Sequence, residues 1–196
     1  MRAVLSYLSD EELARRKAWG LDRHDEMWEG VLHMTPAPTV EHQRILDELI
    51  AFLSRRLAAS GRGTLRSGIN VFRSDQDYRI PDLTFIAAGR EAVIAEDGIR
   101  RGGPDAVIEI RSPHDETDEK LSFYAAIGTR EVIVIDRDTK QSQIFRLRGA
   151  EYVALRADRE GGLRSEALLM RFLATGTTPP RLVVEDAVDA TVRTDI

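Results

Sequence analysis

The chain has 196 residues, 42% hydrophobic and 31% charged, which is typical of one folded domain with its own core rather than of a disordered chain. It has no cysteine, which excludes disulfide bonds, thiolate metal sites and cysteine nucleophiles. A net charge of −5 argues against broad coating of nucleic acid, and no apolar run reaches the roughly 18 residues that span a membrane, so we expect a cytoplasmic protein with no membrane partner.

The first half of the chain predicts two helices and three strands. A capping box of Ser9 and Glu12 marks the start of a short helix, and apolar residues at intervals of four favour a longer helix that ends at Gly61. Alternating apolar and polar residues favour the strands. In chain order, we expect a helix at 10–19, a strand at 26–34, a helix from the 36–39 segment to Gly61, and strands at 65–72 and 78–87.

The second half predicts a more deeply buried sheet. Residues 107–111 and 131–136 are rich in β-branched apolar side chains on both faces, which is typical of interior strands covered on two sides. A helix is expected between them, at 116–127. The order of elements is therefore αβββαβ with extra strands, an α/β or α+β fold with a mixed central sheet flanked by helices.

The remaining segments are expected to lie outside this core. Residues 88–103 predict a loop, and residues 141–147 and 151–155 predict a hairpin. After Gly176, the sequence Thr-Thr-Pro-Pro indicates a linker to a loosely held tail. We therefore expect a single domain at 1–176 and a linker and C-terminal tail at 177–196.

A buried acid is the most informative feature of the sequence. Glu109 stands inside the apolar strand at 107–111, where a carboxylate loses water and needs a charge, hydrogen bonds or a metal as compensation. Asp82 opens another apolar run, and Lys120 follows on a helical pattern. Two acids at strand ends and one lysine are typical of a metal site.

Each of these residues also has a structural interpretation. Asp82 can be a polar strand start after proline, and Lys120 can be an exposed helix lysine. Glu109 can belong to a buried salt bridge with Arg111 or Lys120. The sequence leaves both interpretations open.

The order of these motifs resembles the Uma2 family, which belongs to the PD-(D/E)XK nuclease-like superfamily with the restriction endonuclease fold. The resemblance covers roughly residues 20–155. It is carried by Glu26 to Leu32, Met34, Pro36, Pro38, His42, Pro81-Asp82, Glu109 to Pro113, Lys120, Tyr124, Gly128 and Glu131 to Asp136. It implies a restriction endonuclease-like fold and cleavage of phosphodiester bonds, in DNA, with Mg²⁺ or Mn²⁺ as cofactor.

The resemblance also implies roles for individual residues. Asp82 and Glu109 would bind the metal, helped by a backbone carbonyl such as that of Ile110, and Lys120 would be the catalytic lysine. The usual motif puts lysine two residues after the acid, where this chain has Arg111. Arginine is permanently charged and cannot act as a base, so we expect Arg111 to bind substrate phosphate beside the metal.

Further candidates lie upstream. The family pattern implies that His42, and the acids Glu26 and Glu41, assist the site, although an acid at a helix N-terminus is favoured by the helix dipole in any case. Residues 54–73 carry five arginines and no acid, and they predict either a solvated helix end or a phosphate-facing patch. These arginines are Arg55, Arg56, Arg62, Arg66 and Arg73, of which Arg66 and Arg73 are candidates for phosphate binding. His24, His33 and His114 show no ligand spacing and are expected at the surface or in turns.

Two functions remain open on this evidence. The first is a metal-dependent endonuclease that hydrolyses DNA, for which a homodimer is plausible because two-fold symmetry suits cleavage of both strands. The second is a catalytically weak nucleic-acid-binding or protein-interaction module that retains the nuclease fold. The surviving Asp82, Glu109 and Lys120 favour the first function, and Arg111 favours the second.

Overall fold

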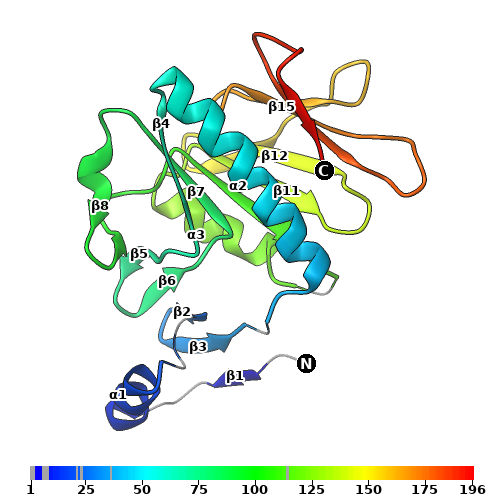
Figure 1. Cartoon of the computed structure of the whole chain (residues 1–196). Coiled ribbons are helices and arrows are strands. Elements are labelled where there is room, and N and C mark those ends of the chain that lie inside the picture. The colour runs from blue at the N-terminus through cyan, green and yellow to red at the C-terminus, as the bar shows by residue number, and fades with distance from the viewer. Residues whose placement is uncertain (1–2, 6–8, 21, 23, 36, 114) are drawn as a thin grey trace.

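The computed structural model describes the chain except for residues 1–2, 6–8, 21, 23, 36 and 114 (Figure 1). Within the described residues, the strands form three sheets, of seven, six and four strands. They are named here the N-terminal, central and C-terminal sheets. This mixed α+β architecture confirms the predicted fold class.

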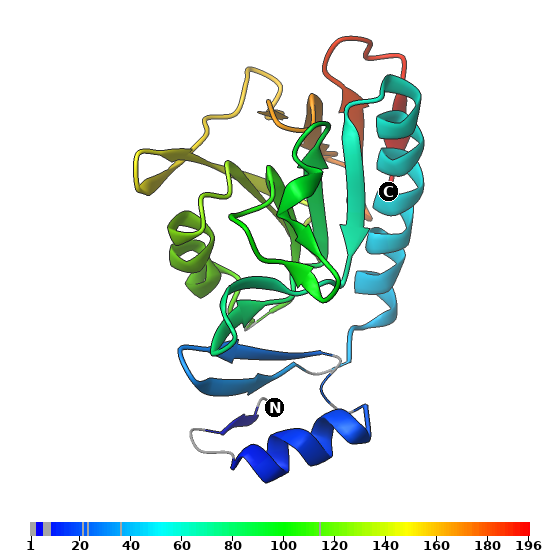
Figure 2. The same cartoon turned by 90° about the vertical axis from the view of Figure 1, so that its left-hand side faces the viewer.

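The central sheet is mixed, since β10 and β11 run parallel while the other neighbours are antiparallel. Its helices are α2 (Val40–Ser60) and α3 (Leu121–Ala126), and Figure 2 shows them on opposite sides of the sheet. Its strands, in spatial order, are β13 (Glu151–Ala154), β12 (Ser142–Arg148), β11 (Glu131–Asp136), β10 (Ala106–Arg111), β7 (Leu83–Ala87) and β4 (Gly63–Ser67).

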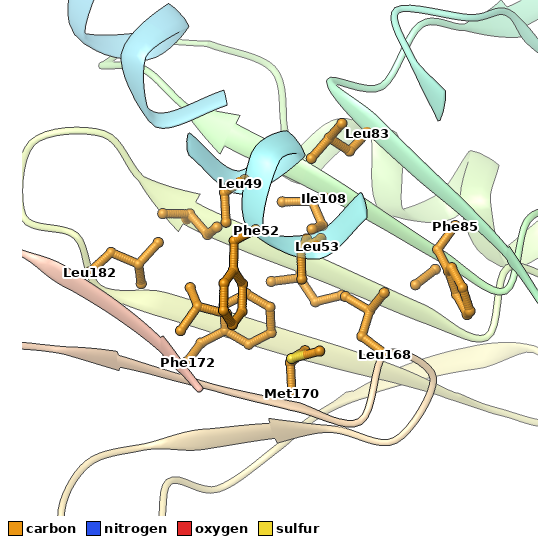
Figure 3. Packing of buried hydrophobic residues seen from close by; sticks show 14 of the residues in the cluster. Leu49, Phe52, Leu53, Leu83, Phe85, Ile108, Leu168, Met170, Phe172 and Leu182 are labelled. Carbon is orange, nitrogen blue, oxygen red and sulfur yellow. The ribbon is translucent and has the colours of Figure 1, made fainter. Parts of the chain in front are cut away.

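Alternation along β10 divides the core into two parts. Ile108 and Ile110 pack on the α2 side, with Leu49 and Leu53 of the helix. Figure 3 shows this cluster reaching on to the C-terminal strands. Val107 instead packs on the α3 side, in a cluster that includes Phe123 and Tyr124. The prediction of strands covered on both faces is therefore confirmed.

The N-terminal sheet corrects several predicted elements. The expected strand at 26–34 is a hairpin, because Glu29 and Gly30 adopt positive φ angles and reverse the chain. Each of the expected strands at 65–72 and 78–87 divides between two sheets. In spatial order the sheet contains β1 (Ala3–Leu5), β3 (Val31–Met34), β2 (Asp25–Trp28), β6 (Asp77–Arg79), β5 (Val71–Ser74), β9 (Gly98–Ile99) and β8 (Ile94–Ala95).

Three further segments differ in detail from the predictions. The capping box of Ser9 and Glu12 starts α1 (Asp10–Ala18) as expected. The predicted helix at 116–127 is shorter and begins as a 3₁₀ turn, η2 (Asp118–Lys120). The predicted loop at 88–103 contains a 3₁₀ turn, η1 (Glu91–Val93), and the short strands β8 and β9, which bury Ile99.

The C-terminal segment is not loosely held, so that part of the expectation is wrong. Residues 177–196 contribute β16 and β17, and Leu182, Val184 and Ile196 are buried in the cluster under α2. The division of the chain at residue 176 stays a prediction. The C-terminal sheet contains β14 (Leu163–Ser165), β15 (Met170–Ala174), β16 (Leu182–Asp186) and β17 (Arg193–Asp195).

Among the described helices, none is both long enough and apolar enough to cross a membrane.

Candidate active site

Strand register brings Asp82 and Glu109 to the same part of the central sheet. Ile108 of β10 pairs with Leu83 of β7 in antiparallel register, so Asp82, one residue before β7, lies beside the end of β10 that carries Glu109. A hydrogen bond fixes this arrangement, since the backbone N–H of Ile110 donates to Oδ2 of Asp82 at 2.7 Å. Two acids distant in sequence therefore meet at adjacent strands.

Glu109 is buried on the α3 side, where two groups of the following helical segment bind it. The Tyr124 hydroxyl donates to Oε1 of Glu109 at 2.6 Å, and Nζ of Lys120 lies 3.4 Å from the same oxygen. Lys120 and Tyr124 are four residues apart, so one helical face presents both to the acid.

Glu26 of β2 completes the surroundings of Lys120. Its Oε1 accepts from Nζ of Lys120 at 2.8 Å and from the backbone N–H of Ile80 at 2.8 Å. Its Oε2 accepts from Nε1 of Trp28 at 2.8 Å. The ammonium of Lys120 therefore lies between two buried carboxylates.

His42 reaches Asp82 from the first turn of α2. Its Nε2 lies 3.0 Å from Oδ1 of Asp82, while its backbone N–H donates to Oγ1 of Thr39, the N-cap, at 3.2 Å. Both oxygens of Asp82 are thus oriented, one by His42 and one by Ile110.

Burial dominates the electrostatics of the cluster. Loss of water raises the pKa of Glu109, and the charges of Asp82 and Glu26 raise it further, to about 7 despite the opposing effect of Lys120. Burial lowers the pKa of Lys120, but Glu109 and Glu26 outweigh it and hold that pKa above its ordinary value. Burial also lowers the pKa of His42, and the hydrogen bond and charge of Asp82 outweigh it, so the net shift is upward.

The oxygen donors of this site suit a hard divalent cation. Mg²⁺ is usually held by one or two carboxylates together with water and substrate phosphate, and Asp82 and Glu109 offer such a pair from adjacent strands. In the described part of the chain, no group of three or more His, Cys, Asp and Glu side chains could hold a metal by itself. The protein would therefore supply only part of the ligand shell of the cation.

The candidate phosphate-binding arginines lie in different places. Arg111 ends β10, with Nη1 3.6 Å from Asp118 and Nη2 3.6 Å from Asp136. Arg66 is exposed on the edge strand β4, and Arg73 is exposed near Asp77, in the N-terminal sheet. Only Arg111 shares its strand with one of the two acids.

Two other arginines of the basic stretch have structural partners. Nε of Arg56 donates to Oδ2 of Asp186 at 2.6 Å, and Nη1 of Arg62 donates to the Leu168 carbonyl at 3.0 Å. They attach the end of α2 to the C-terminal sheet. For these residues the phosphate-facing interpretation is wrong, because their guanidinium groups are held by protein acceptors.

His33 is also placed differently from the prediction. Its side chain is 12% exposed, stacks on Trp28 with ring centroids 4.2 Å apart, and lies 3.1 Å from Glu116. His24 is exposed in a turn as expected, and His114 lies outside the described residues.

Glu41 does not reach the two acids and is engaged elsewhere. Its Oε1 accepts from Nζ of Lys140 at 2.6 Å, and both of its carboxylate oxygens accept from Arg44. Lys140 belongs to the turn after β11 and is buried. No sequence pattern indicates this pairing, which ties the first turn of α2, and with it His42, to the turn after β11.

Comparison with known proteins shows what the chain is similar to. The model of the Uma2 family, described as a putative restriction endonuclease, matches residues 11–176. Among solved structures, the chain is similar to a putative nuclease belonging to DUF820 from Anabaena variabilis, with a TM-score of 0.59 and 18% identity, over 74% of this chain and 82% of that chain. At this identity the likeness shows the fold alone. No curated protein matches the chain.

Proposed function

The chain belongs to the Uma2 family, and from that premise we propose that it is an endonuclease that hydrolyses phosphodiester bonds in DNA with Mg²⁺ or Mn²⁺. The observation that carries the proposal is Glu109, a buried acid beside Asp82 and Lys120. An acid whose burial raises its pKa destabilises the fold, and strongly shifted groups cluster at functional sites.

Asp82 and Glu109 would hold the cation, and their neighbours fix both side chains. The hydrogen bonds from Ile110 and Tyr124 orient the two carboxylates, and His42 holds the second oxygen of Asp82. When bound, the cation would supply charge neutralisation at the phosphate and an activated water.

Lys120 would stabilise the charge that develops on the phosphate oxygens. Its raised pKa keeps the ammonium protonated at neutral pH, so it would serve as an electrostatic donor rather than as a base. Glu26 would position it, because Glu26 is itself held by Ile80 and Trp28.

Arg111 would bind a substrate phosphate. Its guanidinium is less than half exposed and lies at the end of the strand that carries Glu109, and its planar fork matches two phosphate oxygens. A two-fold homodimer would bring such a site to each strand of a duplex. We also propose that the chain acts on this DNA in the cytoplasm, the location expected from the sequence.

One observation favours the second candidate function, a catalytically weak nucleic-acid-binding or protein-interaction module. Nζ of Lys120 lies 2.8 Å from Glu26 and 3.4 Å from Glu109, so the ammonium compensates the buried acids even without a cation. Such a module would keep this cluster for stability alone.

Cleavage of plasmid DNA in Mg²⁺ or Mn²⁺ distinguishes the two functions. We expect the wild-type chain to cleave DNA and EDTA to abolish this cleavage. The variant Glu109→Gln should not cleave DNA. Glu185→Gln is the matched control, because Glu185 pairs with Arg171 in the C-terminal sheet and is remote from the site. Equal cleavage by Glu109→Gln and wild type, or no metal-dependent cleavage of any DNA tested, would overturn the endonuclease in favour of the module.

A further inference from the structure

Helix α1 lies at one end of the molecule, beyond the N-terminal sheet (Figures 1 and 2). The structure describes all nine of its residues, none of which is buried and six of which are exposed. Arg16 attaches the helix to β2, since its Nε and Nη2 donate to Oδ2 of Asp25 at 2.9 and 2.6 Å. Most of the helix surface therefore faces away from the rest of the chain.

So short a helix is not expected to be stable without packing. Isolated helices of fewer than roughly 12–15 residues are marginal in water, and the capping box of Ser9 and Glu12 compensates for this only in part. The C-cap residue, Trp19, is 68% exposed, and the guanidinium of Arg15 lies 5.5 Å from the centroid of its ring. Since tryptophan is enriched where protein surfaces meet, this end of the helix suits contact with another protein surface.

The charges of α1 are divided between its two ends. Three acids stand in the first turn and three bases in the last turn, namely Asp10, Glu11, Glu12, Arg15, Arg16 and Lys17. This division complements the helix dipole, so it does not require a partner by itself. It does restrict which partner fits. Because the acids and bases cancel, the helix as a whole does not attract DNA, whereas a surface with the opposite division of charge would match it.

A second copy of α1 in antiparallel orientation has that opposite division. Two-fold symmetry places the first turn of each helix against the last turn of the other and forms every contact twice. With about 3.6 residues per turn, Glu11 and Arg15 lie on the same side of Ala14, and all three are exposed. A two-fold axis at Ala14 therefore brings Glu11 of each copy next to Arg15 of the other. Ala14 is small enough for the helices to approach closely.

The acids of the first turn are available for such pairs. Among the described residues, Asp10 and Glu11 have no ion-pair partner within the chain. Asp10 lies on the other side of Ala14 from Glu11, where it too faces the basic last turn of the second copy. The parallel arrangement would instead set acids against acids, so the charges favour the antiparallel pair.

We infer that the exposed face of α1 is the interface of a two-fold dimer of this chain. The inference uses no residue of the acid site and does not depend on the endonuclease. Only the use of the two acid sites on the two strands of a duplex rests on the proposed function. Two helices of this length cover less than the roughly 800 Å² per chain of a typical stable complex, so the dimer should dissociate on dilution and in salt.

Sedimentation velocity at low ionic strength, in EDTA and over a range of protein concentrations, measures the dimer. We expect the wild-type chain to change from monomer to dimer as the concentration rises. Glu11→Arg should raise the dissociation constant by about 100-fold, because it sets like charges against Arg15 at both symmetric contacts. Glu48→Arg is the matched control, since it makes the same change on the exposed face of α2 and should keep the wild-type constant.

A charge exchange between two variants tests the pairing itself. Arg15→Glu should also be monomeric, because it sets like charges against Glu11. An equimolar mixture of Glu11→Arg and Arg15→Glu should form a heterodimer. In that heterodimer the two introduced side chains attract each other, and the native Arg15 and Glu11 meet as in the wild type. Formation of the heterodimer would also show that both variants are folded.

Three results would overturn the inference: a wild-type chain that is monomeric at every concentration, a dimer that either single variant retains, or a mixture that stays monomeric. Failure of the interface is distinguishable from failure of the proposed function. A dimer with these properties but without metal-dependent cleavage would support the interface and remove the endonuclease. Metal-dependent cleavage by a chain that is always monomeric would support the endonuclease and overturn the interface.

Discussion

Two buried glutamates on adjacent parallel strands have opposite surroundings. Glu131, 2% exposed, starts β11 and accepts from Nε and Nη2 of Arg146, from the Ser165 hydroxyl and from two backbone N–H groups. Glu109, 4% exposed, lies near the end of β10, with Tyr124 and Lys120 as neighbours and a pKa raised to about 7. Burial alone therefore does not mark a functional acid. The difference lies in how completely the carboxylate is compensated.

The largest expected effect tests this contrast through stability. Glu131→Gln should lower the free energy of unfolding by about 3–5 kcal/mol, because it removes the buried partner of Arg146 and leaves that side chain with the exposed Glu166 as its remaining counter-charge. Glu109→Gln should cost less than about 1 kcal/mol, because a neutral amide removes a charge that burial already disfavours. Urea unfolding of both variants measures the difference. A larger loss for Glu109→Gln would break the comparison.

The next effect concerns the two basic side chains near Glu109, those of Lys120 and Arg111. Lys120→Ala should reduce the rate of metal-dependent DNA cleavage by about 10²–10³-fold, the cost of one lost electrostatic donor in the transition state. Arg111→Ala should mainly weaken substrate binding, since its closest acids are 3.6 Å away at the end of the strand. Single-turnover cleavage at saturating and limiting DNA separates the two. Full activity of Lys120→Ala would contradict the assignment.

The sequence predicted the interior of the central sheet well because both of its parallel strands are apolar on two faces. Glu109 was visible for the same reason, as one charge inside such a strand. The hairpin at β2 and β3 was missed because apolar residues continue across the turn, and only Gly30 signals the reversal. A segment whose composition suits one long strand can therefore still reverse direction where a glycine adopts a positive φ angle.

Partners in the site were harder to predict because they depend on tertiary placement. The resemblance implied roles for Lys120 and His42, but it assigned none to Tyr124, and no sequence pattern pointed to Lys140. The C-terminal strands were missed for a similar reason. Asp186 is buried through Arg56, which is 130 residues away in sequence, and no local pattern encodes that contact. Composition near residue 177 therefore indicated a tail, whereas β16 and β17 pair with each other and with β15 and pack against the distant α2.

Asp186 extends the comparison to a third buried acid. Burial raises its pKa, but the hydrogen bonds from Arg56, Val188 and Asp189 outweigh burial and lower it to about 2. A depressed pKa contributes stability that is present above the unfolded value near 3.8 and is lost as the pH falls toward 2. We expect the free energy of unfolding of the wild-type chain to fall by about 2 kcal/mol over that interval, and Asp186→Asn should lack this decrease. Urea unfolding at pH 4 and pH 2 measures it, and equal pH dependence in both proteins would contradict it.

The smallest expected effect concerns the helix turn that carries His42 rather than the stability of the whole chain. Lys140→Met removes the ion pair between Lys140 and Glu41. Because the Glu41 side chain is half-exposed and remains paired with Arg44, the free energy of unfolding should change by less than about 1 kcal/mol. The first turn of α2 should nevertheless loosen, because Lys140 ties it to the turn after β11. Hydrogen exchange of the His42 amide, capped by Thr39, should therefore accelerate, and Lys17→Met on the exposed face of α1 is the control. If the His42 amide exchanges at the wild-type rate in Lys140→Met, the pair does not hold the helix end that presents His42 to Asp82, and the cap alone suffices.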